Sequence, residues 1–166
     1  PTSGSVEFFL RLYNAPHGQT LPKSYTMDVS AISGSWTEGT GLDMEGYKDK
    51  GSSNWGNRLA SSSAGTHAWA TTGGDYFSDT SSSFSASFDD GTEDIELDIT
   101  PLVEQWLSSS NLGQKEDEGV GVFLSNTYST AARSYYTKRF FARGTEFFYK
   151  QPNIEARWDS SIEDDR

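Results

Sequence analysis

The chain has 166 residues, a formal net charge of −11 and no cysteine. Its length suits a single domain, since domains most often contain roughly 100–150 residues. Affinity for a polyanion comes largely from Lys and Arg, so the acidic balance argues against nucleic acid as a partner. Without cysteine, neither disulfides nor thiolate-bound metals can stabilise the fold, and packing has to do so.

Aromatic residues make up 14% of the chain, and 16 glycines accompany many serines and threonines. This composition is typical of all-β proteins, in which β-formers fill the strands and small residues form the turns. No apolar run approaches the roughly 20 residues that cross a bilayer, and no signal-peptide pattern is present. The composition therefore predicts a soluble all-β protein with little helix and no membrane partner.

Two strands are predicted near the start of the chain. Apolar residues alternate with others from Val6 to Tyr13 and again from Tyr25 to Ala31, with the period of two of a strand whose faces differ in burial. The segment between them, Asn14 to Pro22, has the composition of a loop. The chain begins at Pro1 without an initiator methionine and enters a strand almost at once, so we expect that an upstream N-terminal part is missing.

The segment from Gly34 to Asp79 is rich in Gly, Ser and Asn, and no regular strand is evident in it. Large rings recur there, among them Trp36, Trp55 and Trp69. Because each ring offers ~150–250 Å² to bury, long ordered loops held by aromatic residues are favoured over disorder. The Thr80–Ser83 tip that follows is expected to be mobile.

A hairpin and a helix are predicted next. Alternation from Phe84 to Phe88 and from Ile95 to Ile99 flanks a turn at Asp89–Thr92, which is the clearest hairpin signal in the chain. Thr100 is expected to cap a two-turn helix with Pro101 at its first position. The apolar stripe of that helix would contain Leu102, Val103, Trp106 and Leu107.

Further strands are predicted in the last part of the chain. Val120 to Leu124 indicates a central strand over which a neighbour packs closely at Gly121. Tyr135 to Arg143 and Glu146 to Lys150 are also strand-like, and Ile154 to Trp158 closes the domain.

About eight short strands and one short helix, without a repeat of fixed period, favour a jelly-roll-like β-sandwich. The sequence therefore predicts one all-β domain over residues 1–158. Residues 159–166 are acidic with little to bury, and we expect them to form a C-terminal extension.

No set of residues for catalysis is evident. The only two histidines, His17 and His67, have no partner at metal-ligand or triad spacing. A pair of carboxylates such as Glu38 and Asp43 would serve a polysaccharide depolymerase only if they lay ~5–9 Å apart across a cleft, which spacing in the sequence does not show. We therefore predict a protein that is not an enzyme, with no catalytic residue and no cofactor.

Acidic residues cluster in two loops, at 38–49 and 116–118, and around the predicted hairpin at 89–98. Such loops could hold Ca²⁺, which takes about six to eight oxygen ligands. None of them has the spacing of an EF-hand loop, and acidic loops in a protein of this charge are most often solvated. We predict no metal site and keep calcium as an open alternative.

The tryptophans form the first candidate binding surface. Trp36, Trp55 and Trp69 lie near Asp and Asn residues, as the stacked rings of sugar-binding modules do. The favoured interpretation is that these rings are buried at the ends of the sandwich, where they keep polar loops ordered.

A basic and aromatic stretch forms the second candidate surface. Arg133 to Arg157 holds six of the thirteen basic residues, interleaved with Tyr and Phe, a composition enriched in the cores of protein–protein interfaces. An amphipathic edge strand protected by charge is an equal alternative. The candidate interface residues are Tyr135, Tyr136, Lys138, Arg139, Phe140, Arg143, Phe147 and Tyr149.

Seven motifs spread over most of the chain occur in a recognisable order. They are Trp36–Gly39, Asn54–Trp55, Gly73–Gly74, Ile99–Trp106, Gly119–Val122, Phe141–Glu146 and Pro152–Ala156. Their order resembles the DNRLRE domain family, which includes carbohydrate-binding modules and parts of surface or particle proteins. The hexapeptide that names the family is absent, so the resemblance implies a domain of this type and no particular ligand.

A second set of motifs is Leu42–Asp49, Gly51–Trp55, Gly91–Asp94 and Ser134–Phe148. It resembles structural proteins of marine T4-like phages that infect cyanobacteria and related bacteria, and these carry a segment before the strand that corresponds to Val6–Tyr13. The resemblance implies a virion structural protein of the tail, neck, baseplate or capsid decoration.

The expected partners are other virion proteins within a symmetric, homo-oligomeric assembly, and the expected location is the phage particle. The alternative is a carbohydrate-binding module for host or environmental polysaccharide, with Trp36, Trp55 and Trp69 as the glycan contacts.

Overall fold

The computed structural model describes residues 6–19, 21–38, 52–61, 65–108, 115–130, 132, 137–159 and 161. Strands predominate among them, which confirms the predicted all-β class. The elements are β1 (Val6–Leu12), β2 (Tyr25–Ala31), β3 (Asn57–Ser61), β4 (Gly65–Ala68), β5 (Ser83–Phe88), β6 (Ile95–Asp98), α1 (Thr100–Leu107), β7 (Val120–Leu124), α2 (Asn126–Ser129), η1 (Phe148–Lys150) and β8 (Asn153–Trp158). Of the helices, α2 is a single turn and η1 is a 3-10 helix, so α1 is the one short helix that was predicted.

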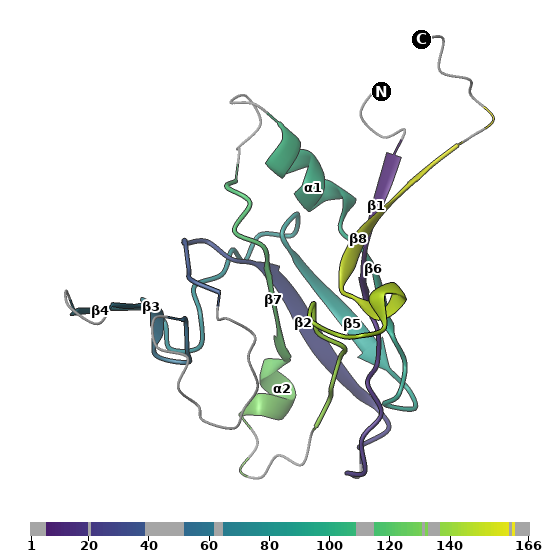
Figure 1. Ribbon diagram of the computed structural model, residues 1–166, viewed down its shortest axis with the longest axis horizontal. Coiled ribbons are helices and arrows are strands. Elements are labelled where there is room, and N and C mark those ends of the chain that lie inside the picture. Colours follow the sequence, from purple (N-terminus) through teal and green to yellow (C-terminus); the bar gives the residue numbers. More distant parts are fainter. Residues whose placement is uncertain are drawn as a thin grey trace.

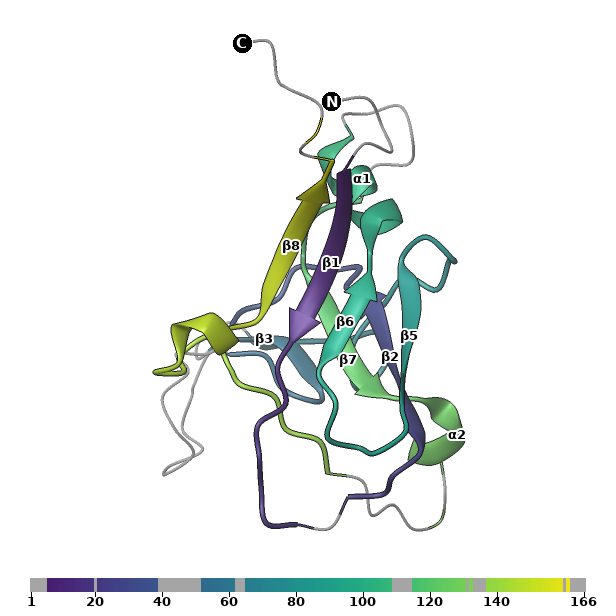
Figure 2. The same ribbon diagram turned by 90° about the vertical axis from the view of Figure 1, so that its right-hand side faces the viewer.

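Two antiparallel sheets of three strands each face one another (Figure 1, Figure 2). Their strand orders are β6-β1-β8 and β5-β2-β7. Among the described residues, the strands β3 and β4, which the sequence did not reveal, pair only with each other, and they project away from the two sheets in Figure 1. The fold is sandwich-like, and the jelly-roll topology stays a prediction.

The core lies between the two sheets and contains alternate residues of their central strands. Leu10 and Leu12 of β1 face Val29 of β2 across it, together with neighbours from β5 and β6. At one end α1 closes the core, where Ile99 and Val103 are buried. Full burial of each such side chain contributes ~1.5–3 kcal/mol, so this layer of contacts stabilises the sandwich.

The predicted hairpin of β5 and β6 is wrong, because the two strands belong to different sheets. β5 pairs with β2, β6 pairs with β1, and the connection between them crosses the core. The carboxylate of Glu93 accepts the N–H groups of Asp89 and Asp90 at 2.7 and 2.6 Å, so these groups need no partner strand. Phe88 and Ile95, on either side of the connection, are both buried in the core.

Where the structure describes them, from residue 137 onward, the strand-like segments before β8 do not form the predicted strands. Phe140 makes only an isolated bridge with Asn14, and Phe148–Lys150 is a 3-10 helix. The central strand β1 already has β6 and β8 on its two sides, so the segment finds no strand edge there. Its aromatic pattern therefore reflects ring packing and exposure rather than sheet alternation.

Thr100 lies at the start of α1 but does not cap it. Its Oγ1 accepts the N–H of Phe8 at 2.8 Å, which ties the helix to β1. Leu107, predicted in the apolar stripe, is 71% exposed, so the buried side of the helix contains Leu102 and Val103 with half-buried Trp106.

Close packing at Gly121 of β7 is confirmed. A Cβ atom there would collide with the ring of Tyr76, so only glycine lets that ring lie on the strand. The strand is not central, however, because in the described part of the chain β7 pairs with β2 alone.

The Thr80–Ser83 tip is more firmly held than predicted. Ser82 is fully buried, and Lys115 Nζ donates to its Oγ at 2.8 Å and to Asp79 Oδ1 at 2.9 Å. Hydroxyl-rich composition suggested mobility, but a lysine from a distant loop satisfies these polar groups.

Candidate functional site

Three tryptophans that are far apart in the sequence line one surface pocket. The pocket has a volume of about 240 Å³ and lies beside the start of the β3–β4 hairpin. We call it the tryptophan cleft; it is lined by Ile32, Trp36, Ser53, Asn54, Trp55, Trp69, Gly73, Tyr76 and Val120. Its residues come from β7 and from the loops that follow β2, precede β3 and follow β4.

Three ring N–H and O–H groups of the tryptophan cleft are used by the protein itself. Trp36 Nε1 donates to the carbonyl of Glu118 at 2.8 Å, and Trp69 Nε1 donates to the carbonyl of Asn54 at 2.9 Å. The hydroxyl of Tyr76 donates to the carbonyl of Gly73 at 2.8 Å. These bonds fix the rings in place and leave their faces, rather than their polar edges, for a ligand.

Trp55 is the most exposed ring of the cleft, at 74%. A Cβ at Gly73 would lie 2.8 Å from this ring, and Gly73 has a φ of +100°, so glycine permits both the contact and the backbone shape. Trp36 is 37% exposed and Trp69 is half-buried. The interpretation of these rings as buried core is therefore wrong for Trp55 and Trp36, which are both exposed.

Few polar side chains in the cleft are free for a ligand. Asn54 Oδ1 accepts the N–H groups of Gly56 and Asn57 at 2.9 and 3.0 Å and so holds its own loop. A pocket of rigid ring faces with few polar groups suits a ligand that stacks, as the apolar faces of pyranose sugars do.

A second exposed group of rings lies at η1. Phe147, Phe148 and Tyr149 are 40%, 79% and 60% exposed, and we call them the aromatic ridge. The ring of Tyr149 meets those of Phe147 and Phe148 edge to face, with centroids 6.2 and 5.9 Å apart. Lys150 Nζ lies 5.8 Å from the Phe147 ring centroid and 4.8 Å from that of Phe141. The ridge is thus an ordered apolar surface with a cation at its base.

Two of the predicted interface residues face the interior. Lys138 Nζ donates to the carbonyls of Glu93 and Gly91 at 2.6 and 3.1 Å and lies 4.6 Å from the centroid of the Phe88 ring. Burial lowers the pKa of Lys138, while Glu93 and Asp94 act in the opposite direction. Phe140 is half-buried and packs against the core, with Lys138 Nζ 5.2 Å from its ring centroid. Both residues therefore stabilise the connection between β5 and β6, which is the crossing between the sheets.

The remaining predicted interface residues are placed differently. Arg139 is exposed, and Arg143 is exposed with an ion pair to Glu38 at 3.1 Å. Phe147 and Tyr149 belong to the aromatic ridge, whereas Tyr135 and Tyr136 lie outside the described residues. Phe148, the most exposed ring of the ridge, was not among the predicted residues, although the Phe-Phe-Tyr run that contains it is a signal in the sequence.

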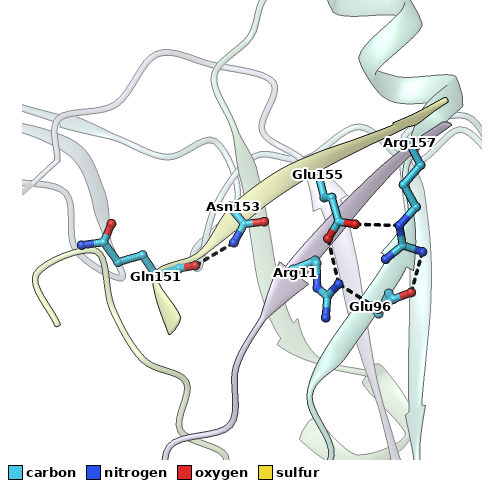
Figure 3. Close-up of polar contacts among 6 residues, drawn as sticks. All are labelled: Arg11, Glu96, Gln151, Asn153, Glu155 and Arg157. Carbon is cyan, nitrogen blue, oxygen red and sulfur yellow. Dashed lines mark hydrogen bonds and ion pairs between the residues drawn. The ribbon is translucent and has the colours of Figure 1, made fainter. Parts of the chain in front are cut away.

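Four charged side chains form a network on the outer face of the β6-β1-β8 sheet (Figure 3). Arg11 Nη1 lies 2.7 Å from a carboxylate oxygen of Glu155 and 3.3 Å from one of Glu96. Arg157 donates to Glu96 and to Glu155, both at 2.8 Å. Hydrogen bonds from Arg157 lower the pKa of both carboxyls, and all three strands contribute to the network.

The two histidines have separate surroundings. His17 Nε2 lies 3.2 Å from the carbonyl of Thr137, and its Nδ1 accepts the N–H of Gln19 at 3.1 Å. His67 is exposed on β4. Among the described residues, no three His, Asp or Glu side chains are grouped to hold a metal ion, and Asp43 lies outside those residues.

No helix in the described part of the chain has the length and apolar character needed to cross a membrane.

Comparison with known proteins found no match among family models, curated proteins or solved structures. The resemblances to DNRLRE domains and to phage structural proteins therefore rest on the motifs of the chain alone.

Proposed function

We propose that this protein is a non-enzymatic structural component of a bacteriophage particle and that it acts by protein–protein assembly. The aromatic ridge carries the proposal, since it exposes three consecutive large rings, with Phe148 at 79%. Contiguous exposed apolar side chains mark interaction sites, and aromatic residues contribute much of the binding energy at protein interfaces.

The charges around the ridge support the same role. Arg139, Arg143 and Lys150 are basic residues near the ridge in the sequence of a chain whose net charge is −11. A local reversal of sign guides association with acidic neighbours and opposes wrong orientations. The phage setting is supported by the resemblance of the Ser134–Phe148 motif to phage structural proteins.

The test is incorporation of the chain into assembled particles. We expect the wild-type chain at a defined copy number in purified particles, by cryo-electron microscopy and quantitative mass spectrometry. A double variant with Phe148→Ala and Tyr149→Ala should remain folded and lose incorporation. The control is Leu107→Ala on α1, which removes a side chain of similar exposure, 71%, and should still be incorporated. Absence of the wild-type chain from all particles would overturn the proposal.

A carbohydrate-binding module is a second candidate, and the tryptophan cleft supports it. The cleft offers the ring faces of Trp36 and Trp55 beside a 240 Å³ pocket, and the ring N–H groups of Trp36 and Trp69 are already bonded within the protein. Binding there would use stacking, which tolerates several related sugars.

Glycan arrays followed by calorimetry test this second candidate. We expect Trp55→Ala to weaken binding by about tenfold or more, because it removes the most exposed ring of the cleft. Trp158→Ala is the matched control, since Trp158 is 66% exposed and lies on β8 outside the cleft. Failure of the wild-type protein to bind any glycan, or equal loss in both variants, would remove this candidate.

A further inference from the structure

The strand β8 has an uncovered apolar face. Its residues Ile154, Ala156 and Trp158 point to the same side as Leu10 of β1, which is 5% exposed in the core. Yet Ile154 is 46% and Trp158 66% exposed, and Ala156 is exposed as well. Side chains on the core-facing side of this sheet are thus left open to solvent at its β8 edge.

The edge of β8 also offers backbone groups to which no described residue bonds. Phe8 donates its N–H to Thr100 Oγ1 and accepts from the N–H of Ile99, so both of its backbone groups point away from β8. Phe8 lies opposite Ala156, and in an antiparallel ladder such a pair exchanges no hydrogen bonds. The N–H and C=O of Ala156, and by alternation those of Ile154 and Trp158, therefore point outward from the sheet.

Several of the usual protective devices are missing from this edge. In the described residues β8 pairs with β1 alone, and Figure 2 shows it as the outermost strand of its sheet. Its six residues, Asn153–Trp158, contain no lysine and no proline and pair with β1 in a continuous register, and the charged residues Glu155 and Arg157 lie on the outer face. Lysine, proline and β-bulges are among the usual devices by which proteins prevent an edge strand from pairing with another chain.

We propose that β8 pairs antiparallel with β8 of a second copy, with the two-fold axis at Ala156. Each copy then places Ile154 opposite the partner's Trp158 and Glu155 opposite the partner's Arg157. Ala156 lies opposite itself, where its small side chain avoids a clash on the axis. The inference deepens the proposed assembly role, on which it rests, by naming a second copy as one partner.

The charged residues of β8 favour this register over the two registers nearest to it. Residues directly opposite each other in an antiparallel pair have their side chains on the same face of the sheet. The two-fold axis must therefore pass through a residue of β8, and moving the axis by one residue shifts the pairing by two residues. With the axis at Glu155, two carboxylates would oppose each other and Pro152 would lie opposite Trp158. With the axis at Arg157, two guanidinium groups would oppose each other and Glu155 would face Asp159. Like charges directly opposite are unfavourable, and of these three registers only the axis at Ala156 joins opposite charges and apolar pairs together.

The charged network of the outer face continues across such a pair. Glu155 and Arg157 are already linked to Arg11 and Glu96 and remain partly exposed, with 38% and 36% of their side chains accessible (Figure 3). Opposition of Glu155 to the partner's Arg157 would extend alternating charge over a six-stranded sheet with the order β6-β1-β8-β8-β1-β6. A two-fold interface of this kind is self-complementary, so it needs no other protein.

Single cysteines test the register, because the natural chain has none. In Ala156→Cys the two Cα atoms would lie about 5.5 Å apart across the axis, within the range of a disulfide. Asn153→Cys is the control on the same strand: it lies opposite residue 159 of the partner, about 20 Å from the partner's own position 153. Under mild oxidation we expect covalent dimers of Ala156→Cys in at least about tenfold excess over those of Asn153→Cys.

Charge reversal tests the same contact without a covalent bond. Glu155→Arg alone places Arg opposite Arg, and Arg157→Glu alone places Glu opposite Glu, so each variant should self-associate about tenfold more weakly than wild type in sedimentation. A mixture of the two variants restores both opposite-charge pairs and should form dimers of one copy each. Thermal unfolding of each variant alone confirms that it is folded.

Two results would overturn the proposal. One is equal crosslinking of the two cysteine variants; the other is self-association that neither reversal weakens or that mixing does not recover. These outcomes are separate from the proposed function, because particle incorporation is measured through Phe148 and Tyr149. A chain that enters particles but shows no pairing through β8 keeps its assembly role and loses the two-fold partner.

Discussion

The strands β2 and β8 show the same alternation of side chains and opposite degrees of burial. On β2, Tyr25 and Val29 are 2% and 0% exposed, whereas Ile154 and Trp158 on β8 are 46% and 66% exposed. β2 is the central strand of its sheet, and its apolar side contributes to the core that both sheets share. β8 lies at the edge of its sheet, where the second layer does not cover its side chains.

This difference separates stability from association. The apolar residues of a covered strand hold the two sheets together, and their loss is felt as unfolding. The apolar residues of an uncovered edge contribute little to the isolated fold and remain available to a partner. Alternation therefore identifies the inner side of a strand, and the opposite layer decides what that side does.

The largest effect is expected beside the covered strand β2, at Phe88 of its neighbour β5. Phe88 is 1% exposed and stacks on Tyr25 of β2 with centroids 4.7 Å apart. Phe88→Ala should lower the free energy of unfolding by about 3–5 kcal/mol, measured by urea denaturation. Trp158→Ala on the uncovered face should change it by less than about 1 kcal/mol at protein concentrations where the chain is monomeric. Equal losses in the monomer would mean that the chain itself covers the apolar face of β8 and would end the comparison.

A smaller loss is expected where β7 lies beside β2. In Gly121→Ala the new methyl group would collide with the Tyr76 ring, and displacement of that ring should cost about 1–3 kcal/mol of stability. Gly34→Ala is the control, because a Cβ there meets no atom within 4 Å and its φ is not in the left-handed region. Thermal unfolding should separate the two variants, and a Gly121→Ala protein as stable as wild type would contradict the packing of Tyr76 on β7.

Substitution of the adjacent basic residues Lys138 and Arg139 should change stability to different extents, because Lys138 packs inward and Arg139 is exposed. Lys138→Met removes two hydrogen bonds to the crossing between the sheets and a cation beside Phe88, at an expected cost of about 1–2 kcal/mol. Arg139→Met, at an exposed position, should change stability by less than about 0.5 kcal/mol. If Arg139→Met proved the more destabilising of the two, the inward placement of Lys138 would be refuted.

The smallest effect is expected at the same crossing between the sheets, where the stability of the fold should depend on pH. Desolvation raises the pKa of Glu93, but hydrogen bonds from backbone N–H groups, including those of Asp90 and Asp89, outweigh it and lower the pKa to about 2. A carboxyl with a depressed folded pKa stabilises the fold above its unfolded pKa, near 4.5, and this contribution is lost as the pH falls toward 2.

Glu93→Gln should therefore be less stable than wild type by about 1 kcal/mol at neutral pH, a value reduced for screening by solvent. The difference between the two proteins should shrink between pH 5 and pH 2, because a protonated Glu93 resembles Gln. Chemical denaturation across this range measures it, and a constant difference would assign the loss to a cause other than charge.

Parts of the candidate sites could be predicted from the sequence. The three tryptophans were identified as possible ligand contacts because aromatic residues are conspicuous in a Gly- and Ser-rich segment. Their assembly into one pocket was not predictable, since Trp36, Trp55 and Trp69 come from separate loops and meet Val120 of β7 only in the folded chain. The basic and aromatic stretch was noticed as a whole, but its composition did not reveal that Lys138 turns inward and Phe148 outward.

By itself, the sequence determined the all-β class, the strands β1, β2, β5, β6, β7 and β8, and the helix α1, because side-chain alternation and helix signals are local properties of the chain. The tertiary structure alone decided that β5 and β6 belong to opposite sheets and that β8 is an uncovered edge. These features depend on which distant segments meet, and a period of two records the two faces of a strand without naming the layer that covers either of them.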